Sequence, residues 1–158
     1  MTSSESSAPK PIATIGYEGA TVRTFLDALQ EGRVDLLVDV RAIASSRRPG
    51  FAKSRLAANV QSIGIEYLHL RGLGTPAEGR AAARAGRHAE LRAIYREHLD
   101  TPAAQADLAV LADLVRSRRR VCLLCLEADP THCHRSLVVA ALAAQMPLDV
   151  THLAPAIE

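Results

Sequence analysis

The most constraining feature of the sequence is Val121–Leu126, an unbroken apolar segment that reads VCLLCL. A strand that is apolar at every position has to be covered on both faces, as in a parallel sheet between two layers of helices. Other short apolar segments, at 12–17, 34–40, 65–70 and 150–153, have the length and the composition of strands. We predict a strand at each of these segments.

Helical periodicity separates the predicted strands. Apolar residues recur at helical spacing between Thr21, which can cap a helix, and Gly32, which can end one. Thr101 and Pro102 are a cap followed by proline at the first helical position. Strands that alternate with helices imply parallel crossovers. We therefore predict an α/β fold of three layers, with a mostly parallel sheet and helices on both faces. Further helices are predicted around 56–63, 91–99 and 137–144.

The composition is that of one domain: 158 residues, 48% of them apolar and 23% charged. Residues 1–11 are polar and Ser-rich, so we predict a disordered tail before a single domain over residues 12–158. No stretch resembles a signal peptide or a membrane span, which predicts a cytoplasmic protein without a membrane partner. The cysteines, Cys122, Cys125 and Cys133, are an odd number in one stretch, and this favours a reducing compartment over a disulfide framework.

Charge and aromatic content bear on the class of ligand. The formal net charge of +2 is too small to indicate a polyanionic partner by itself, and 3% aromatic residues disfavour a stacking platform for single-stranded nucleic acid. The basic residues are almost all arginine, which suits bidentate contacts to anions. Residues 71–88 interrupt the alternation with glycines and arginines. They could form a mobile lid that carries anion contacts, or a solvated helix.

Polar residues follow three of the predicted strands. Ligands of parallel α/β proteins bind beyond the carboxyl ends of the strands, so these residues are candidates for a site. Tyr17 and Glu18 follow the first strand. The second ends at Asp39 and Arg41, before a loop that contains Ser46 and Arg47, and the fourth is followed by Glu127 and the residues 129–135.

Cys133 is the candidate nucleophile or key polar contact. It falls between a buried strand and the first turn of a helix, beside Arg135, and both the helix terminus and the arginine favour a thiolate. The structural alternative is a free cysteine that packs as a small apolar residue. Cys122 and Cys125 lie three apart within a strand and so face opposite sides, which argues against a C-x-x-C zinc site. We assign no metal ligands, and a partial set of Cys125, Cys133 and one histidine stays open.

Asp39 and Glu127 are the candidate acid–base groups. Asp39 lies on an otherwise apolar strand, so its carboxylate needs a partner such as Arg41 or Arg135. In the structural alternative this is a buried ion pair that orders the end of the strand. In the functional interpretation the carboxylates act as general base or metal ligands, while Arg41, Arg47 and Arg135 hold an anion such as phosphate.

An ordered set of motifs resembles the domain of unknown function 488 family: TIGYEG at 14–19, DVR at 39–41, SRRPGF at 46–51, GIEYLHLRGLG at 64–74 and CLEADPTHCHR at 125–135. The family often has a proline between DVR and SR, where this chain has Ala44. The resemblance implies a single α/β domain whose polar motif residues gather in one place, and it implies no particular reaction. By motif match, the implied site residues are Tyr17, Asp39, Arg41, Ser46, Arg47, Glu127, Cys133, His134 and Arg135.

The leading hypothesis is an enzyme that acts on a phosphate-bearing substrate, such as a nucleotide or the end of a nucleic acid. Cys133 would be the nucleophile or key contact, Asp39 or Glu127 the acid–base group, and the arginines would hold the anion. One alternative is a non-catalytic module that binds a nucleotide or nucleic acid with salt-dependent affinity. Another is a structural or interaction domain whose polar cluster stabilises the strand ends. The sequence identifies neither a cofactor nor an oligomeric state.

Overall fold

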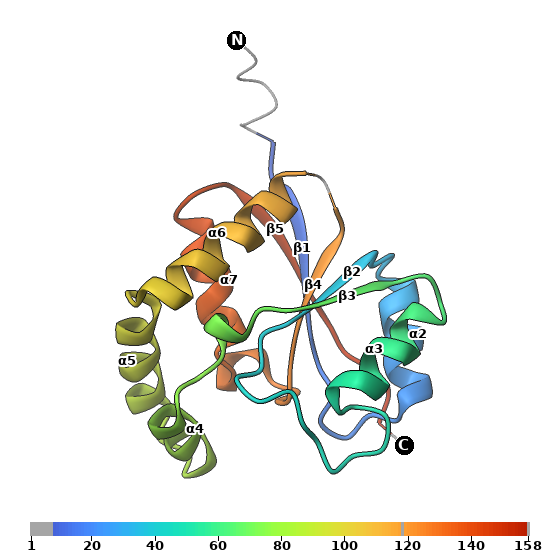
Figure 1. Ribbon diagram of the computed structural model, residues 1–158, viewed down its shortest axis with the longest axis horizontal. Coiled ribbons are helices and arrows are strands. Elements are labelled where there is room, and N and C mark those ends of the chain that lie inside the picture. The colour runs from blue at the N-terminus through green and yellow to red at the C-terminus, as the bar shows by residue number, and fades with distance from the viewer. Residues whose placement is uncertain (1–7, 118, 158) are drawn as a thin grey trace.

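A computed structural model describes residues 8–117 and 119–157 of the chain (Figure 1). Within them, all strand pairings are parallel and belong to one sheet. The spatial order is β3-β2-β4-β1-β5, so β4 lies at the centre between β2 and β1. The strands are β1 (Lys10–Gly16), β2 (Leu36–Asp39), β3 (Glu66–His69), β4 (Val121–Cys125) and β5 (Leu148–Leu153).

Helices cover both faces of this sheet (Figure 1). One face carries α2 (Val22–Glu31) and α3 (Lys53–Gln61). The other face carries α6 (Pro102–Arg116) and α7 (Arg135–Ala143), with α5 (His88–Leu99) and then α4 (Ala77–Arg84) alongside. Two short 3-10 helices are η1 (Arg71–Leu73) and η2 (Pro130–His132). This arrangement confirms the predicted three-layer α/β fold.

The helix ends follow the capping residues of the sequence. Thr21 caps α2, because its Oγ1 accepts a hydrogen bond from the Thr24 amide at 3.1 Å, and Gly32 ends that helix. Thr101 caps α6 through the Ala104 amide, and Pro102 occupies the first turn. Both helices therefore begin where local chemistry favours a start.

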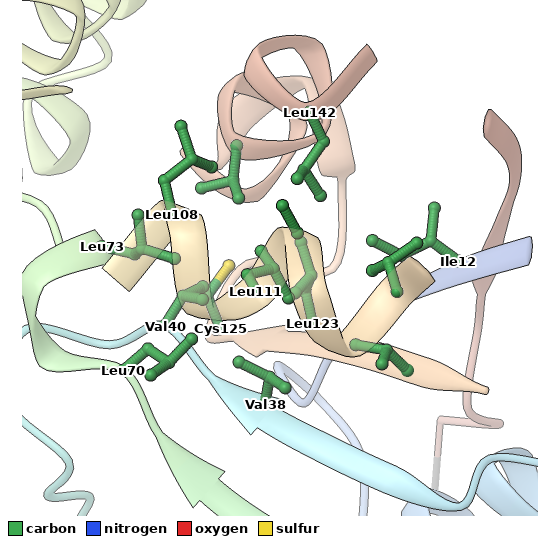
Figure 2. Packing of buried hydrophobic residues seen from close by; sticks show 14 of the residues in the cluster. Ile12, Val38, Val40, Leu70, Leu73, Leu108, Leu111, Leu123, Cys125 and Leu142 are labelled. Atoms are coloured by element: carbon green, nitrogen blue, oxygen red, sulfur yellow. The ribbon is translucent and has the colours of Figure 1, made fainter. Parts of the chain in front are cut away.

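The strand β4 divides the apolar core into two clusters. Leu123 and Cys125 point to the side of α6 and α7, where Leu111 and Leu142 pack on the sheet (Figure 2). Leu124 belongs to the cluster on the α2 and α3 side. Every residue of β4 is buried, which accounts for the unbroken apolar segment from which the fold was predicted.

Several details differ from the sequence-based expectation. β1 begins at Lys10, inside the predicted tail, while residues 1–7 of that tail lie outside the part of the chain that the structure describes. The segment 71–88 holds η1 and α4, and α4 buries Gly79 and Ala82. It is a packed helix with one exposed face. Within residues 8–117 and 119–157, no helix is long and apolar enough to cross a membrane.

The site is positioned by close backbone contacts beyond the strand ends. The register places Gly16 of β1 beside Cys125 of β4, so both strands end at one level. A Cβ at Gly16 would collide with the carbonyl oxygen of Glu127, and one at Gly74 would collide with Ala42. Glycine at these two positions lets the loops after β4 and β3 approach their neighbours.

Candidate functional site

A pocket of about 500 Å³ lies beyond the carboxyl ends of β1, β2 and β4. Its opposite wall comes from α4 and the start of α5, as expected for a parallel sheet that binds ligands at this edge. Five predicted site residues line it: Tyr17, Arg41, Glu127, Cys133 and His134. Four others lie elsewhere: Asp39 and Arg135 are buried, Ser46 is half-buried and Arg47 is exposed.

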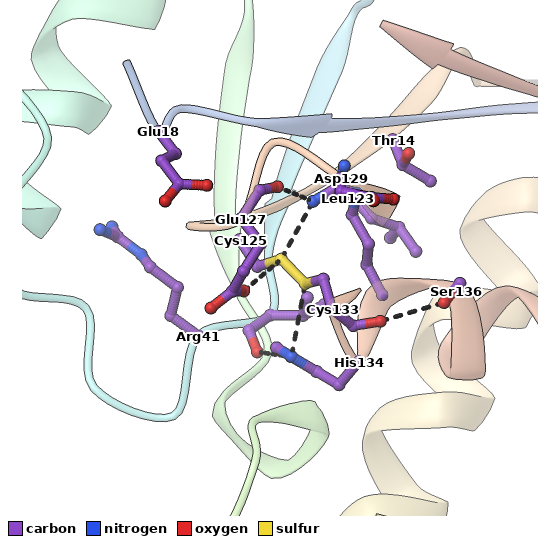
Figure 3. The surroundings of a disulfide bond; sticks show 12 residues. Thr14, Glu18, Arg41, Leu123, Cys125, Glu127, Asp129, Cys133, His134 and Ser136 are labelled. Atoms are coloured by element: carbon purple, nitrogen blue, oxygen red, sulfur yellow. Dashed lines mark hydrogen bonds between the residues drawn. A yellow bond between two sulfur atoms is a disulfide. The ribbon is translucent and has the colours of Figure 1, made fainter. Parts of the chain in front are cut away.

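Cys125 and Cys133 line the pocket together, and the structure joins them by a disulfide (Figure 3). The expectation of three unpaired cysteines is therefore wrong for this pair, and Cys122 is the one left free among the described residues. Counting cysteines along the sequence missed the pairing because the loop after β4 turns back on itself through η2. This fold brings the start of α7 next to the end of β4, with the two Cα atoms 7.3 Å apart.

His134 is held with one ring nitrogen towards the sulfur atoms. Its Nε2 lies 2.7 Å from the carbonyl oxygen of Val40, and because a carbonyl only accepts, Nε2 carries the proton and donates it. In the neutral ring, Nδ1 then has a free lone pair, and it lies 3.7 Å from Sγ of Cys133. Burial lowers the pKa of His134 to about 4, so the ring is neutral near pH 7.

Arg135 lies under the pocket and is fully buried. Its Nη1 donates to the Glu127 carbonyl at 2.5 Å and to Sγ of Cys125 at 3.2 Å, and its Nη2 donates to the Ala128 carbonyl at 3.2 Å. Among the residues that the structure describes, its Nε has no partner and no carboxylate pairs with the guanidinium. Burial lowers the Arg135 pKa. The side chain thus fixes the loop after β4 and does not reach the pocket.

Asp39 and Arg41 form a buried ion pair at the end of β2. Nε and Nη2 of Arg41 donate to the two carboxylate oxygens at 2.9 and 2.7 Å. Nη1 donates to the Phe51 carbonyl at 2.8 Å and to the Tyr17 hydroxyl at 3.3 Å. Burial by itself lowers the Arg41 pKa, but the hydrogen bonds and charge of Asp39 raise it above its ordinary value. Most donors of Arg41 are therefore engaged within the protein.

Tyr67 completes this cluster. Its hydroxyl donates to Asp39 at 2.5 Å, and both burial and that carboxylate raise the Tyr67 pKa. Asp39 is thereby shielded from the pocket. A direct acid–base role for this carboxylate would require the cluster to open.

Glu127 is the predicted acid–base carboxylate that lines the pocket, together with Glu18 and Asp129. It is half-buried, and its Oε1 lies 3.8 Å from Sγ of Cys125 (Figure 3). Burial raises the pKa of this carboxyl group, and the nearby Glu18 raises it further.

The loop after β2 holds the two remaining predicted residues. The Ser46 hydroxyl accepts a hydrogen bond from the Arg48 amide at 3.1 Å, which orders the turn. Arg48, rather than Arg47, makes a structural contact: its guanidinium donates to the Ala20 carbonyl. The Arg47 side chain is exposed on the loop and does not line the pocket.

The predicted set of site residues left out Arg80, Arg84 and His88 on the opposite wall, and His132 of η2, which also line the pocket. Arg80 donates to the Thr75 carbonyl at 2.9 Å, Arg84 is exposed, and the rings of His88 and His132 stack with centroids 4.2 Å apart. The sequence feature that pointed to this wall was the arginine-rich segment 71–88. The sequence could not show that α4 folds back across the strand ends.

The fold has three layers around a parallel sheet, and the Cys-His-Arg loop lies at the carboxyl edge of that sheet. Together they define an α/β protein with a pocket at the strand ends. The family model of the domain of unknown function DUF488 matches residues 21–142, and the chain belongs to this family. This confirms the resemblance seen in the motifs. No curated protein and no solved structure matches the chain.

Proposed function

We propose that the protein is an enzyme that acts on a phosphate-bearing substrate, a nucleotide or the end of a nucleic acid, in the pocket at the strand ends. The observation that supports the proposal is that reactive and positively charged side chains line the same pocket. A thiol position at Cys133, a carboxyl group at Glu127 and the guanidinium groups of Arg80 and Arg84 all line it. Its volume of about 500 Å³ suits a small molecule.

Arg80 and Arg84 hold the phosphate in this proposal. Arg84 is exposed, and among the described residues Arg80 donates a hydrogen bond through Nη1 alone, to the Thr75 carbonyl. Both guanidinium groups therefore have donors available to an anion, and arginine binds phosphate in a bidentate manner. Arg41 also lines the pocket wall, and Asp39 is the positioning residue that fixes it there.

Cys133 and Glu127 are the catalytic residues of the proposal, because they face the space where a phosphate held by α4 would present its ester bond. Both sulfur atoms are needed in the reduced form, since a disulfide leaves no thiol to react. A reducing compartment such as the cytoplasm would keep them reduced, and we propose this location on that chemical ground.

The test is a turnover screen with the full-length protein kept under a thiol reductant. The probes are p-nitrophenyl phosphate, a set of nucleotides and a 5′-phosphorylated oligonucleotide, with products identified by mass spectrometry. For a probe that is turned over, we expect Cys133→Ser to lower kcat by about 100-fold or more. Arg84→Gln should raise KM by roughly 10- to 100-fold, because a charge-assisted hydrogen bond contributes about 1.5–3 kcal/mol.

Arg92→Gln is the matched control, because Arg92 is exposed on α5 and does not line the pocket. It should leave KM unchanged. If a probe binds with salt-dependent affinity and is recovered intact, the protein is a binding module and not an enzyme. If no probe binds or is turned over, the remaining interpretation is that the polar cluster only stabilises the strand ends.

A further inference from the structure

Three metal-ligating atoms meet at the floor of the pocket. Sγ of Cys125, Sγ of Cys133 and a ring nitrogen of His134 lie within 4.8 Å of one another, and all three residues are buried. Cys125 ends β4, while Cys133 and His134 immediately precede α7. The set therefore rests on two regular elements of the core.

The ring of His134 has the hydrogen bonding that is typical of a metal-binding histidine. Metal-binding histidines usually donate their second ring N–H to a carbonyl or carboxylate, which fixes the tautomer. The Val40 carbonyl provides this acceptor for Nε2, and Nδ1 faces Sγ of Cys133 at 3.7 Å. Around a tetrahedral zinc ion, a sulfur and a nitrogen ligand lie about 3.5 Å apart, as follows from the usual bond lengths. The observed separation is close to this value.

Arg135 supplies an independent argument for negative charge at the sulfur atoms. A buried guanidinium needs an anionic partner, since burying an unpaired charge is costly. Among the described residues Arg135 has no carboxylate partner, and the side-chain atom to which it donates is Sγ of Cys125, at 3.2 Å. Two thiolates at this position would give the guanidinium the partner that it lacks.

The spacing of the two cysteines leaves room for an ion. Their Cα atoms stand 7.3 Å apart, wider than the range of about 4.4–6.8 Å in which disulfides usually form. Two thiolates that share a zinc ion have sulfur atoms about 3.8 Å apart, and the wider backbone spacing accommodates this arrangement.

We infer that Cys125, Cys133 and His134 bind one zinc ion in the dithiol form of the protein, with the fourth coordination position open to the pocket. Binding releases one proton from each thiol to solvent and forms two zinc–sulfur bonds and one zinc–nitrogen bond. The zinc site and the disulfide are alternative states of the same two sulfur atoms. The ion, the two thiolates, the Glu127 carboxylate and the Arg135 guanidinium together carry no net charge.

The zinc site does not depend on the proposed function. If the protein is an enzyme, however, the site changes the role of Cys133 in the reaction. A sulfur atom bound to zinc is a ligand, so Cys133 would act through the ion instead of attacking the substrate. Zinc with three protein ligands and an open position polarises phosphoryl oxygen atoms and activates water. Glu127 lines the pocket beside Cys125 and is placed to accept the proton of such a water.

The experiment is a cobalt titration of the full-length chain, reduced with a phosphine and then freed of the reductant without air. Cobalt(II) replaces zinc in tetrahedral sites and reports thiolate ligands by a charge-transfer band in the near ultraviolet. We expect the band to saturate at one ion per chain and to disappear when zinc is added. In the wild-type protein, zinc should also slow the alkylation of Cys125 and Cys133.

The variants separate the ligands from the third cysteine. Cys125→Ser, Cys133→Ser and His134→Ala should each weaken cobalt binding about 100-fold or more, because loss of an outer-shell partner alone costs about 10–100-fold. Cys122→Ala is the control and should leave the titration unchanged, since Cys122 is buried on the opposite face of the sheet. Circular dichroism establishes that each variant is folded.

Absence of the band in the reduced, folded wild-type protein would overturn the inference, as would a band that survives Cys133→Ser or is lost in Cys122→Ala. Zinc that leaves the alkylation rates unchanged would overturn it as well, and this readout needs no variant. None of these outcomes depends on turnover, so the metal site and the proposed enzyme can fail separately.

Discussion

The buried ion pair at the end of β2 shows at the scale of single residues how a strand end is fixed. Asp39 has no exposed surface and accepts hydrogen bonds from Arg41 and from the Tyr67 hydroxyl. Replacing Asp39 by Asn leaves the Arg41 guanidinium buried without its counter-charge. We expect the free energy of unfolding to fall by about 3–5 kcal/mol, which lowers Tm by roughly 10 °C.

Thermal unfolding of the Asp39→Asn variant by circular dichroism measures this effect. Asp113→Asn is the control, because the Asp113–Arg116 pair is exposed and such pairs contribute about 0–1 kcal/mol. A Tm within about 2 °C of wild type for Asp39→Asn would mean that the pair does not stabilise the fold.

Gly16 lies against the backbone of Glu127, so a larger residue at this position should destabilise the fold. A methyl group at this position would meet the carbonyl of Glu127, with its Cβ 2.5 Å from the carbonyl carbon. Backbone must therefore shift in the Gly16→Ala variant, and overpacking of this kind costs about 1–3 kcal/mol. Urea unfolding should show this loss. Gly64→Ala, which meets no atom within 4 Å and is strained only by its φ of +82°, should lose about 1 kcal/mol.

The candidate site could be predicted from the sequence only where residues sit directly at strand ends. Tyr17 directly follows β1, and Arg41 and Glu127 lie two residues beyond the ends of β2 and β4, so their presence at one edge follows from parallel pairing alone. The partners of Arg135 depend instead on how the loop 126–134 folds, and the local turn at Asp129 and Pro130 does not by itself determine where the rest of that loop lies. For the same reason the pairing of Cys133 with Cys125 was not predicted.

At the scale of elements, α5 is joined to η1 by two side chains, His98, whose Nε2 lies 2.8 Å from the Gly72 carbonyl oxygen, and Tyr95. The Tyr95 hydroxyl donates to the Leu73 carbonyl of η1 at 2.5 Å, and the ring has no exposed surface. Tyr95→Phe leaves that carbonyl without its donor, which costs about 1–3 kcal/mol. Hydrogen exchange should then accelerate in α5, which leads into the pocket wall. Amides of α2, on the far face of the sheet, serve as the internal control, and equal acceleration in both helices would show that the bond acts on global stability alone.

Element boundaries were predicted best where a side chain caps a helix. Thr21 and Thr101 fixed the starts of α2 and α6, because capping is a local interaction. The strand β5 begins at Leu148, two residues before the predicted start at Val150. It begins there because it pairs with β1 along its length, and a tertiary partner cannot be read from local composition.

At the scale of the whole molecule, the alternation of strands and helices was enough to predict the fold class, whereas the order β3-β2-β4-β1-β5 was not predictable. That order makes β4 the shared wall of both apolar clusters. Leu123 lies in the cluster under α6 and α7, and Leu124 lies in the cluster under α2 and α3. Neither layer can keep its core if the central strand is lost.

The single domain predicted over residues 12–158 should therefore unfold as one unit. Leu123→Ala opens a cavity on the α6 side only, and such changes cost about 2–5 kcal/mol. In one cooperative unit, native-state hydrogen exchange should show the most protected amides of α6 and of α2 losing this free energy equally. Val110→Ala, at a largely exposed position of α6, should change neither helix by more than about 0.5 kcal/mol. A loss confined to α6 would divide the chain into two units, each with its own core.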